Sequence, residues 1–245
     1  MGLLGKGNNT VMKLTLLFTV LLLSAKPCLS QPIVNDTIYL DKDWNPCVKE
    51  QHHYFRVITE DNTTMAPERL FKVKDYYRSG KMQMEGYLLA ADSSIYKGLY
   101  KWYDKKGRLK DLCLYDYAHS KPYFAELNKY TQLLEPCDTT NTIFSVHFFK
   151  RGQVHYLGFY KTDIPSNAKT VNTSERICTW KRFNQFNKDI VYLYEYENGA
   201  LNGRCYTYRS KGRLWKEKYY ANGHKTGTWK FYKADGTLKK TKKQG

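Results

Sequence analysis

A pattern of four positions occurs three times in this chain of 245 residues. Each copy has a glycine, a tyrosine five residues later, a second glycine four residues after that, and a leucine two residues further on. The copies are Gly98, Tyr103, Gly107 and Leu109; Gly203, Tyr208, Gly212 and Leu214; and Gly227, Tyr232, Gly236 and Leu238. Repeats offset by about 20–50 residues favour units that bury a face against their neighbours. The pattern indicates an architecture rather than a reaction.

The residues between the repeated positions indicate tight turns and short strands. Hairpin turns are predicted at Asn198-Gly199, Asn222-Gly223 and Asp235-Gly236. In the frame Tyr-x-x-x-Gly the glycine is expected to take positive φ and close a turn with a bulge. Tyr192, Tyr194 and Tyr196 alternate, so they are expected to share one face of a strand. The fold class predicted is all-β: an antiparallel meander of repeated β-hairpins with at most one short helix.

These segments resemble the MORN-variant repeat family. The best match is 219–232, Tyr-Tyr-Ala-Asn-Gly-His-Lys-Thr-Gly-Thr-Trp-Lys-Phe-Tyr, in which Gly223 and Trp229 are further repeat positions. Residues 76–81 and 97–103 resemble an earlier pair, and 148–152 match more weakly. The resemblance covers roughly 71–110 and 190–241 and implies a bacterial, non-enzymatic repeat protein. Bacterial members of this family are often labelled antitoxins.

The N-terminus predicts export. Residues 14–25 are almost wholly apolar, follow Lys13 and precede the small residues Cys28 and Ser30. This is typical of a signal peptide (1–30) cleaved after Ser30, which predicts a secreted or periplasmic protein without a later transmembrane segment. The alternatives are a non-cleaved anchor and a lipoprotein anchored at Cys28, although Lys26-Pro27 does not fit the usual sequence before a lipidated cysteine. Export also argues against the antitoxin label.

The remaining chain is divided by loops. We expect an N-terminal β region over 31–165, with the early repeat pair at about 71–110, and C-terminal repeats with a basic tail over 175–245. The loop 165–174 is the expected boundary between them. Residues 122–134 are the one helix candidate, because Phe124, Leu127, Thr131 and Leu134 have helical spacing.

Cysteine, histidine and aspartate residues offer few candidates for chemistry. The five cysteines after the signal allow one or two disulfides and leave at least one thiol over. Candidate constellations are Cys47 with His52 or His53, His147 opposite His155, and the carboxylates of Asp41 and Asp43. Ordinary packing or turn roles explain each of them, and no catalytic motif is present. We therefore expect no enzyme activity, no metal and no cofactor.

Positive charge is concentrated at the C-terminus. Residues 199–245 contain 13 Lys or Arg against two acidic residues, Glu217 and Asp235, a formal charge of +11. The binding residues predicted are Arg204, Arg209, Arg213, Lys216, Lys218 and Lys230, expected on the side opposite the buried aromatics. They favour an anionic polymer or lipid surface over a specific nucleic acid. The simpler interpretation is that the cations protect sheet edges and keep the surface soluble.

Two functions follow from these features of the sequence. The first is an exported binding or structural module of the cell envelope that acts through its basic C-terminal repeats. The alternative is a protein-interaction scaffold that uses the aromatic face of the sheet.

Overall fold

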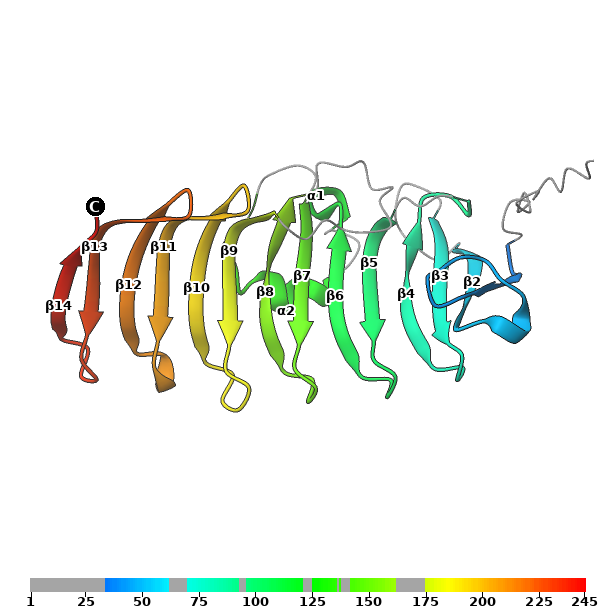
Figure 1. The fold of residues 1–245 in the computed structure, drawn as a ribbon, viewed down its shortest axis with the longest axis horizontal. Coiled ribbons are helices and arrows are strands. Elements are labelled where there is room, and N and C mark those ends of the chain that lie inside the picture. Colours follow the sequence, from blue (N-terminus) through cyan, green and yellow to red (C-terminus); the bar gives the residue numbers. More distant parts are fainter. Residues whose placement is uncertain are drawn as a thin grey trace, which may run out of the picture. The chain divides into compact units, whose positions relative to one another are not determined.

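The protein forms one antiparallel sheet of fourteen strands whose spatial order is the order of the chain. The structure, a computed structural model, describes residues 34–61, 70–92, 96–120, 125–135, 137, 142–161 and 175–245. Each strand pairs with the next along the sequence, as the meander prediction requires (Figure 1). The strands are β1 Thr37–Leu40, β2 Tyr54–Asp61, β3 Leu70–Tyr77, β4 Met82–Leu88, β5 Tyr96–Tyr103, β6 Leu109–Tyr115, β7 Thr142–Phe148, β8 Val154–Lys161, β9 Arg176–Phe183, β10 Ile190–Glu197, β11 Ala200–Tyr208, β12 Leu214–Ala221, β13 His224–Tyr232 and β14 Leu238–Lys243.

The turns have the chemistry that the sequence predicts. Asn198 and Gly199 both have positive φ, 46° and 78°, which gives the two-residue hairpin joining β10 and β11. Asn222 and Gly223 repeat this geometry between β12 and β13, with φ of 48° and 80°. At Asp235-Gly236 only the glycine has positive φ, and the turn spans five residues between β13 and β14.

The three copies of the repeat occupy equivalent positions in the sheet. The first glycine of each copy has positive φ inside a strand: 65° at Gly98, 101° at Gly203 and 64° at Gly227. The tyrosine that ends one strand pairs with the leucine that begins the next, and a bulge lies beside each pair. The second glycine of each copy, in the turn itself, also has positive φ. The predicted turn frame is therefore confirmed.

Helical structure is limited to short segments. α1 is Tyr117–Ser120, α2 is Asn128–Thr131, and the 3₁₀ turns are η1 Lys49–Gln51, η3 Ala125–Leu127 and η4 Ser210–Gly212. The helix predicted over 122–134 corresponds to η3 and α2, while its first three residues lie outside the described part of the chain. α1 was not expected from the sequence. Leu127 and Leu134 are buried, consistent with the apolar side assigned to this segment.

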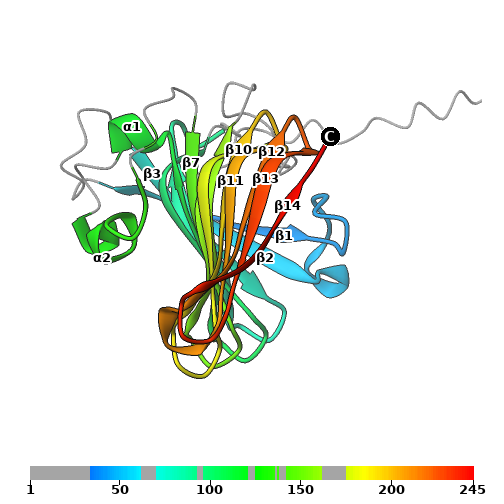
Figure 2. The ribbon, with the colours of Figure 1, turned by 90° about the vertical axis from the view of Figure 1, so that its left-hand side faces the viewer.

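The two faces of the sheet pack differently. On the helical face, Leu114, Phe144, Leu157 and Ile177 form a core beneath α1 and α2, which lie together on one side of the strands in Figure 2. The opposite face, called the aromatic face here, carries the buried tyrosines of the strands and Trp180. Its residues are Val73, Met84, Tyr100, Tyr115, Tyr160, Trp180, Tyr194 and Tyr196, with Trp229 further along. The predicted single face for Tyr192, Tyr194 and Tyr196 is confirmed by their ring contacts.

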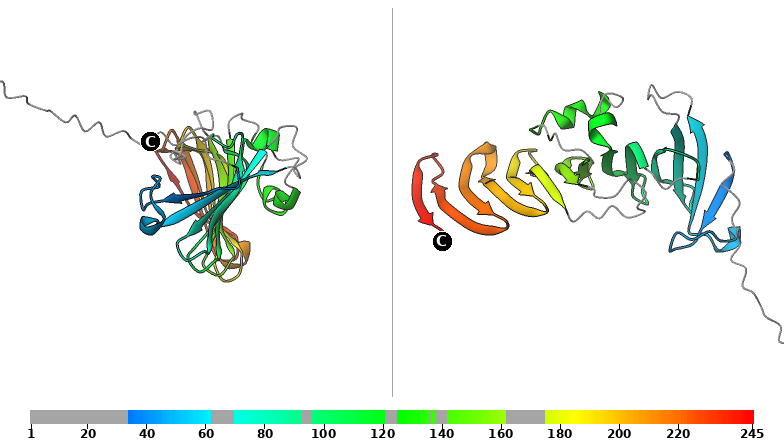
Figure 3. Two further views of the ribbon diagram at one scale, coloured as in Figure 1. Left: turned by 90° about the vertical axis from the view of Figure 1, so that its right-hand side faces the viewer. Right: turned by 90° about the horizontal axis from the view of Figure 1, so that it is seen from above.

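The sheet is continuous where the sequence suggested a boundary. β8 and β9 lie on either side of 165–174 and are hydrogen-bonded neighbours. Residues 31–245 form one compact unit, and β9 to β14 follow in order in the right-hand view of Figure 3. The helical segment is tied to β9 by a disulfide between Cys137 and Cys178. Cys47, Cys113 and Cys205 have free thiols.

Candidate polyanion-binding face

Strand register aligns one row of side chains across all fourteen strands of the aromatic face. Cross-strand partners in an antiparallel sheet lie on the same face, so the register can be followed from strand to strand. The row is Ile38, Arg56, Asp75, Met84, Trp102, Asp111, His147, Tyr156, Arg182, Tyr192, Thr207, Lys216, Phe231 and Lys240.

Charges in the first half of this row are paired. Arg56 donates two hydrogen bonds to the buried carboxylate of Asp75, at 2.7 and 2.8 Å. Asp111 accepts a hydrogen bond from the His147 imidazole. Burial raises the pKa of Asp111, but the hydrogen bond and charge of His147 outweigh it and lower the pKa overall. This half of the row therefore has little net charge to offer a ligand.

The second half of the row carries only positive charge. From β9 onward its charged members are Arg182, Lys216 and Lys240. A second row on the same face pairs Cys205 with Lys218, and Trp229 with Lys242. Lys216 and Lys240 flank Phe231 across three adjacent strands. Neighbouring strands lie about 4.8 Å apart, so the two lysines are separated by about 10 Å.

Cationic groups lie over the aromatic rings of this face. The Lys218 ammonium is 4.7 Å from the centre of the Trp229 ring and that of Lys225 is 5.7 Å away. Lys240 lies 5.2 Å from the Phe231 ring. Further along, the Arg176 guanidinium lies 4.7 Å from the Trp180 ring and that of Arg182 lies 5.6 Å from Tyr192. Such contacts are worth about 0.5–1 kcal/mol at exposed sites and hold the charges in a fixed array.

No carboxylate neutralises this array within 175–245. Glu195 and Glu217 lie on the helical face, since they alternate with Tyr194 and Lys216. The other acidic residues of this part of the chain lie at strand ends or in turns: Glu175, Asp189, Glu197 and Asp235. Burial first, and then the charges of Lys216 and Lys225, lower the pKa of Lys218, as expected for crowded like charges.

The six binding residues predicted from the sequence do not form one surface. Lys216 and Lys218 lie on the aromatic face, whereas Lys230 lies on the helical face and forms an ion pair with Glu217 at 3.4 Å. Arg204 is the cross-strand partner of Tyr219 on that same helical face. The prediction that the cations lie opposite the buried aromatics is therefore wrong for Lys216 and Lys218. Bulges at positions such as Gly203 interrupt the alternation of side chains between the two faces. Counting odd and even positions in the sequence therefore did not assign each residue to its face.

The two remaining predicted residues lie in the turn between β11 and β12. The Arg209 guanidinium lies 4.9 Å from the Trp215 ring. Arg213 donates a hydrogen bond to the Ala234 carbonyl oxygen at 3.1 Å. Sequence reasoning also missed five cations of the aromatic face: Arg176, Arg182, Lys225, Lys240 and Lys242. The alternation of side chains shows which residues of one strand share a face. The register between strands is also needed to show that these five cations, from different strands, share the same face.

The other candidate constellations are separated or occupied. His147 is the cross-strand partner of Tyr156, so the adjacent His155 points to the opposite face and does not face His147 as expected. Asp41 Oδ1 accepts from the backbone N–H groups of Asp43 and Asn45, which explains it as a turn residue. Among the described residues no group of three or more His, Cys, Asp or Glu side chains could hold a metal ion.

A hydrogen-bonded chain on β6 and β7 was not anticipated. It runs from Asp111 through His147 and Ser145 to Cys113, with 3.0 Å between His147 Nε2 and Ser145 Oγ. Its order of groups is that of a Ser-His-Asp triad. Ser145 is fully buried, however, and burial raises the pKa of the Cys113 thiol to about 12. The buried Ser145 hydroxyl is therefore out of reach of a substrate, and the chain instead satisfies buried polar groups.

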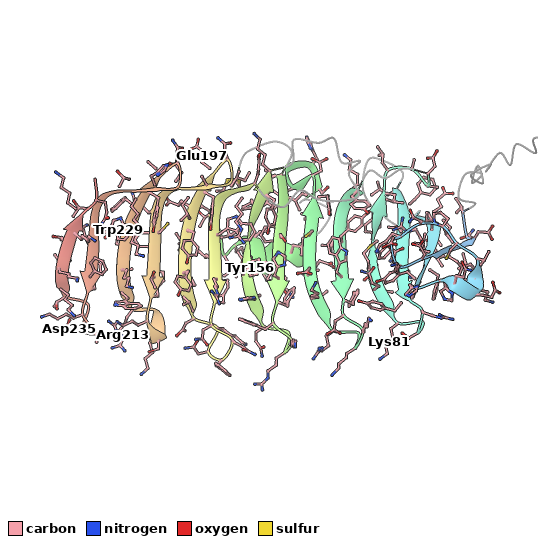
Figure 4. The ribbon with its side chains drawn as sticks, viewed as in Figure 1. Lys81, Tyr156, Glu197, Arg213, Trp229 and Asp235 are labelled. Carbon is pink, nitrogen blue, oxygen red and sulfur yellow. A yellow bond between two sulfur atoms is a disulfide. The ribbon has the colours of Figure 1, made fainter. Side chains whose placement is uncertain are left out.

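Tyr156 and Trp229 both project from the middle of their strands in Figure 4.

Comparison of the chain with models of known protein families and with curated protein sequences finds no match. No helix among the described residues has the length and apolar character needed to cross a membrane.

Proposed function

We propose that this chain is an exported, non-enzymatic module that binds an anionic polymer of the cell envelope through the aromatic face of β9 to β14. The single observation behind this proposal is the set of cations that the register places on that face without any carboxylate. They are Arg176, Arg182, Lys216, Lys218, Lys225, Lys240 and Lys242. The resemblance to MORN-variant repeats fits a binding or structural module and remains part of the proposal.

Two observations support export. The apolar run at 14–25 and the small residues before Gln31 are typical of a cleaved signal. The Cys137–Cys178 disulfide fits a compartment that oxidises thiols.

The geometry favours an extended polyanion over a compact ligand. Cations recur in two rows perpendicular to the strands, and the rows contain rings and hydroxyl groups between the charges. A polymer lying along the rows would make many weak contacts, each worth about 0.2–1 kcal/mol at a solvent-exposed position. Its affinity should fall steeply with salt, because exposed charges are screened within about 10 Å at 0.1 M ionic strength.

The test is retention of the mature protein on heparin resin, a soluble-polyanion probe, at low and moderate salt. A variant with Lys216, Lys218, Lys240 and Lys242 changed to Gln removes four charges from the face. We expect this variant to bind roughly tenfold more weakly or worse, the equivalent of about 1.4 kcal/mol.

The matched control changes Lys42, Lys49, Lys72 and Lys74 to Gln, which removes the same charge outside β9 to β14. It should keep near wild-type retention. Equal losses in both variants would mean that net charge alone governs binding. If retention changes neither with salt concentration nor in either variant, the alternative function is favoured, a protein-interaction scaffold that uses the aromatic face.

A further inference from the structure

The antiparallel order gathers six hairpin turns at one end of the sheet. Successive connections of a meander lie at alternate ends of the sheet, so every second connection lies at this end (Figure 1). These are β3–β4, β5–β6, β7–β8, β9–β10, β11–β12 and β13–β14. We call these six connections the basic turn end. They comprise residues 78–81, 104–108, 149–153, 184–189, 209–213 and 233–237.

Every one of these turns carries exposed positive charge. The six turns contain twelve exposed Lys or Arg side chains: Arg78, Lys81, Lys105, Lys106, Arg108, Lys150, Arg151, Lys188, Arg209, Lys211, Arg213 and Lys233. Three aspartates oppose them, and each makes contacts within the turns. Asp104 pairs with Arg108 at 2.6 Å, Asp189 accepts from the Lys211 backbone N–H, and Asp235 accepts from Thr237. The six turns therefore carry a formal charge of +9.

Exposed apolar side chains lie at this same end. Phe186 in the β9–β10 turn is 81% exposed, and Leu238 at the start of β14 is 52% exposed. Trp215, one residue into β12, is 36% exposed. Val48, 58% exposed, lies in the β1–β2 connection, which is hydrogen-bonded to the β3–β4 turn through Arg78. Leu133 is the one other large apolar side chain exposed among the described residues.

The opposite end of the sheet has the contrary charge. Apart from the segment 125–137, which packs on the helical face, its described connections hold no Lys or Arg against three acidic residues: Asp92, Asp116 and Glu175. Figure 4 shows Glu197 at this end, whereas Lys81, Arg213 and Asp235 lie at the other. The described part of the chain is thus polarised along its strands, with positive charge and exposed apolar side chains combined at the basic turn end.

We infer that the basic turn end docks on the surface of a bilayer that contains anionic phospholipids, with Phe186, Trp215 and Leu238 entering the headgroup region. Apart from Lys216, whose ammonium also lies beside the Trp215 ring, this site is distinct from the aromatic face proposed to bind a soluble polymer.

The chemistry of the turns favours a bilayer over a soluble polyanion. Basic side chains are attracted to a surface of anionic lipid, and adjacent apolar side chains gain by leaving water. Trp215 has the Lys216 ammonium 3.7 Å and the Arg209 guanidinium 4.9 Å from its ring centre. An aromatic ring flanked by cations suits the level of the lipid headgroups, where Trp is enriched. A soluble polymer would leave Phe186 and Leu238 in water.

The test is co-sedimentation of the mature protein with vesicles of phosphatidylcholine, with or without phosphatidylglycerol, at moderate salt. Wild-type protein should sediment with the anionic vesicles alone. The triple variant Phe186→Ser, Trp215→Ser and Leu238→Ser should bind these vesicles roughly tenfold more weakly or worse, because its turns keep their charge but lose the apolar contacts. The control Leu133→Ser removes an exposed leucine outside the six turns, beside α2 on the helical face, and should bind as wild type.

A second readout follows Trp215 itself. Tryptophan emission should shift to shorter wavelength when anionic vesicles are added to wild-type protein, and the shift should disappear in Trp215→Phe while sedimentation persists. Heparin retention of the triple variant should equal that of wild type, which separates this site from the aromatic face. A triple variant that sediments like wild type, or vesicle binding without an emission shift, would overturn the inference. If wild-type protein binds the anionic vesicles but not heparin, the polymer proposal is overturned and the inference of bilayer docking stands.

Discussion

At the scale of single residues, glycine has two different roles in this sheet. Gly86 and Gly158 have ordinary φ, but a Cβ there would lie 2.3 Å from the Tyr100 ring and 2.2 Å from the Trp180 ring. These glycines make room for a large ring on the neighbouring strand. Gly212 and Gly236 have open space around them and φ of 67° and 89°. Their role is conformational, since other residues are strained in that region.

The turn glycines can be tested without a packing change. We expect Gly212→Val and Gly236→Val each to lower the free energy of unfolding by about 1–2 kcal/mol, because a β-branched residue is strained at positive φ. Urea unfolding measures the effect, with Ser210→Val as the exposed control in the same turn as Gly212. Equal free energies of unfolding for the three variants would show that the positive φ at Gly212 and Gly236 does not require glycine.

The turn glycines were predictable from the sequence and the packing glycines were not. Gly212 and Gly236 stand at fixed distances from Tyr208 and Tyr232, and this local spacing indicates a turn. The role of Gly158 depends on Trp180, which lies 22 residues away and meets it only through the register of β8 and β9. The same reason explains why the six predicted binding residues divided between two faces: bulges alter the alternation that the sequence displays.

At the scale of elements, the described residues between β6 and β7 cover the core of the helical face. Leu127 and Leu134 are buried against it, and Tyr117 of α1 contacts the Phe144 and Phe159 rings at 5.9 and 5.0 Å. Helices of four residues are not stable alone. Packing on the sheet and the disulfide from Cys137 to β9 hold this segment in place.

Loss of that disulfide should therefore destabilise the protein. The two cysteines are 41 residues apart in sequence, and the chain-entropy relation gives about 4 kcal/mol for a loop of this length. We expect Cys137→Ala with Cys178→Ala to unfold at distinctly lower urea concentration. Cys47→Ala, which removes a free thiol, is the control. Wild-type protein whose urea midpoint is unchanged by a reducing agent would contradict this role for the disulfide.

At the scale of the whole sheet, burial declines from the centre to the C-terminal strands. Tyr100, Leu114, Val146 and Leu157 are completely buried in β5 to β8, whereas every residue of β14 is exposed. Local opening costs least where few apolar groups are buried. The described sheet is thus expected to have unequal stability along its length.

Hydrogen exchange should reveal this gradient. We expect the slowest amide exchange in β5 to β9 and the fastest among the strands in β13 and β14, measured by mass spectrometry of peptic fragments after a time course in D₂O. The comparison between β7–β8 and β13–β14 is internally controlled, because both are tight hairpins with a glycine at positive φ in the turn. Equal protection in these two hairpins would mean that the sheet opens as one cooperative unit.

The sequential order of the strands also bears on how the chain reaches this structure. Each strand of the sheet needs only the strand before it, so no pairing waits for a distant segment to be synthesised. Short sequence separations between partners lower the entropic cost of pairing and speed folding. A chain that emerges from a ribosome or a narrow pore N-terminus first could therefore add hairpins one after another. Hairpins that fold outside the pore would then prevent the chain from sliding back through it. The Lys-rich β14 would be the last strand to join the sheet.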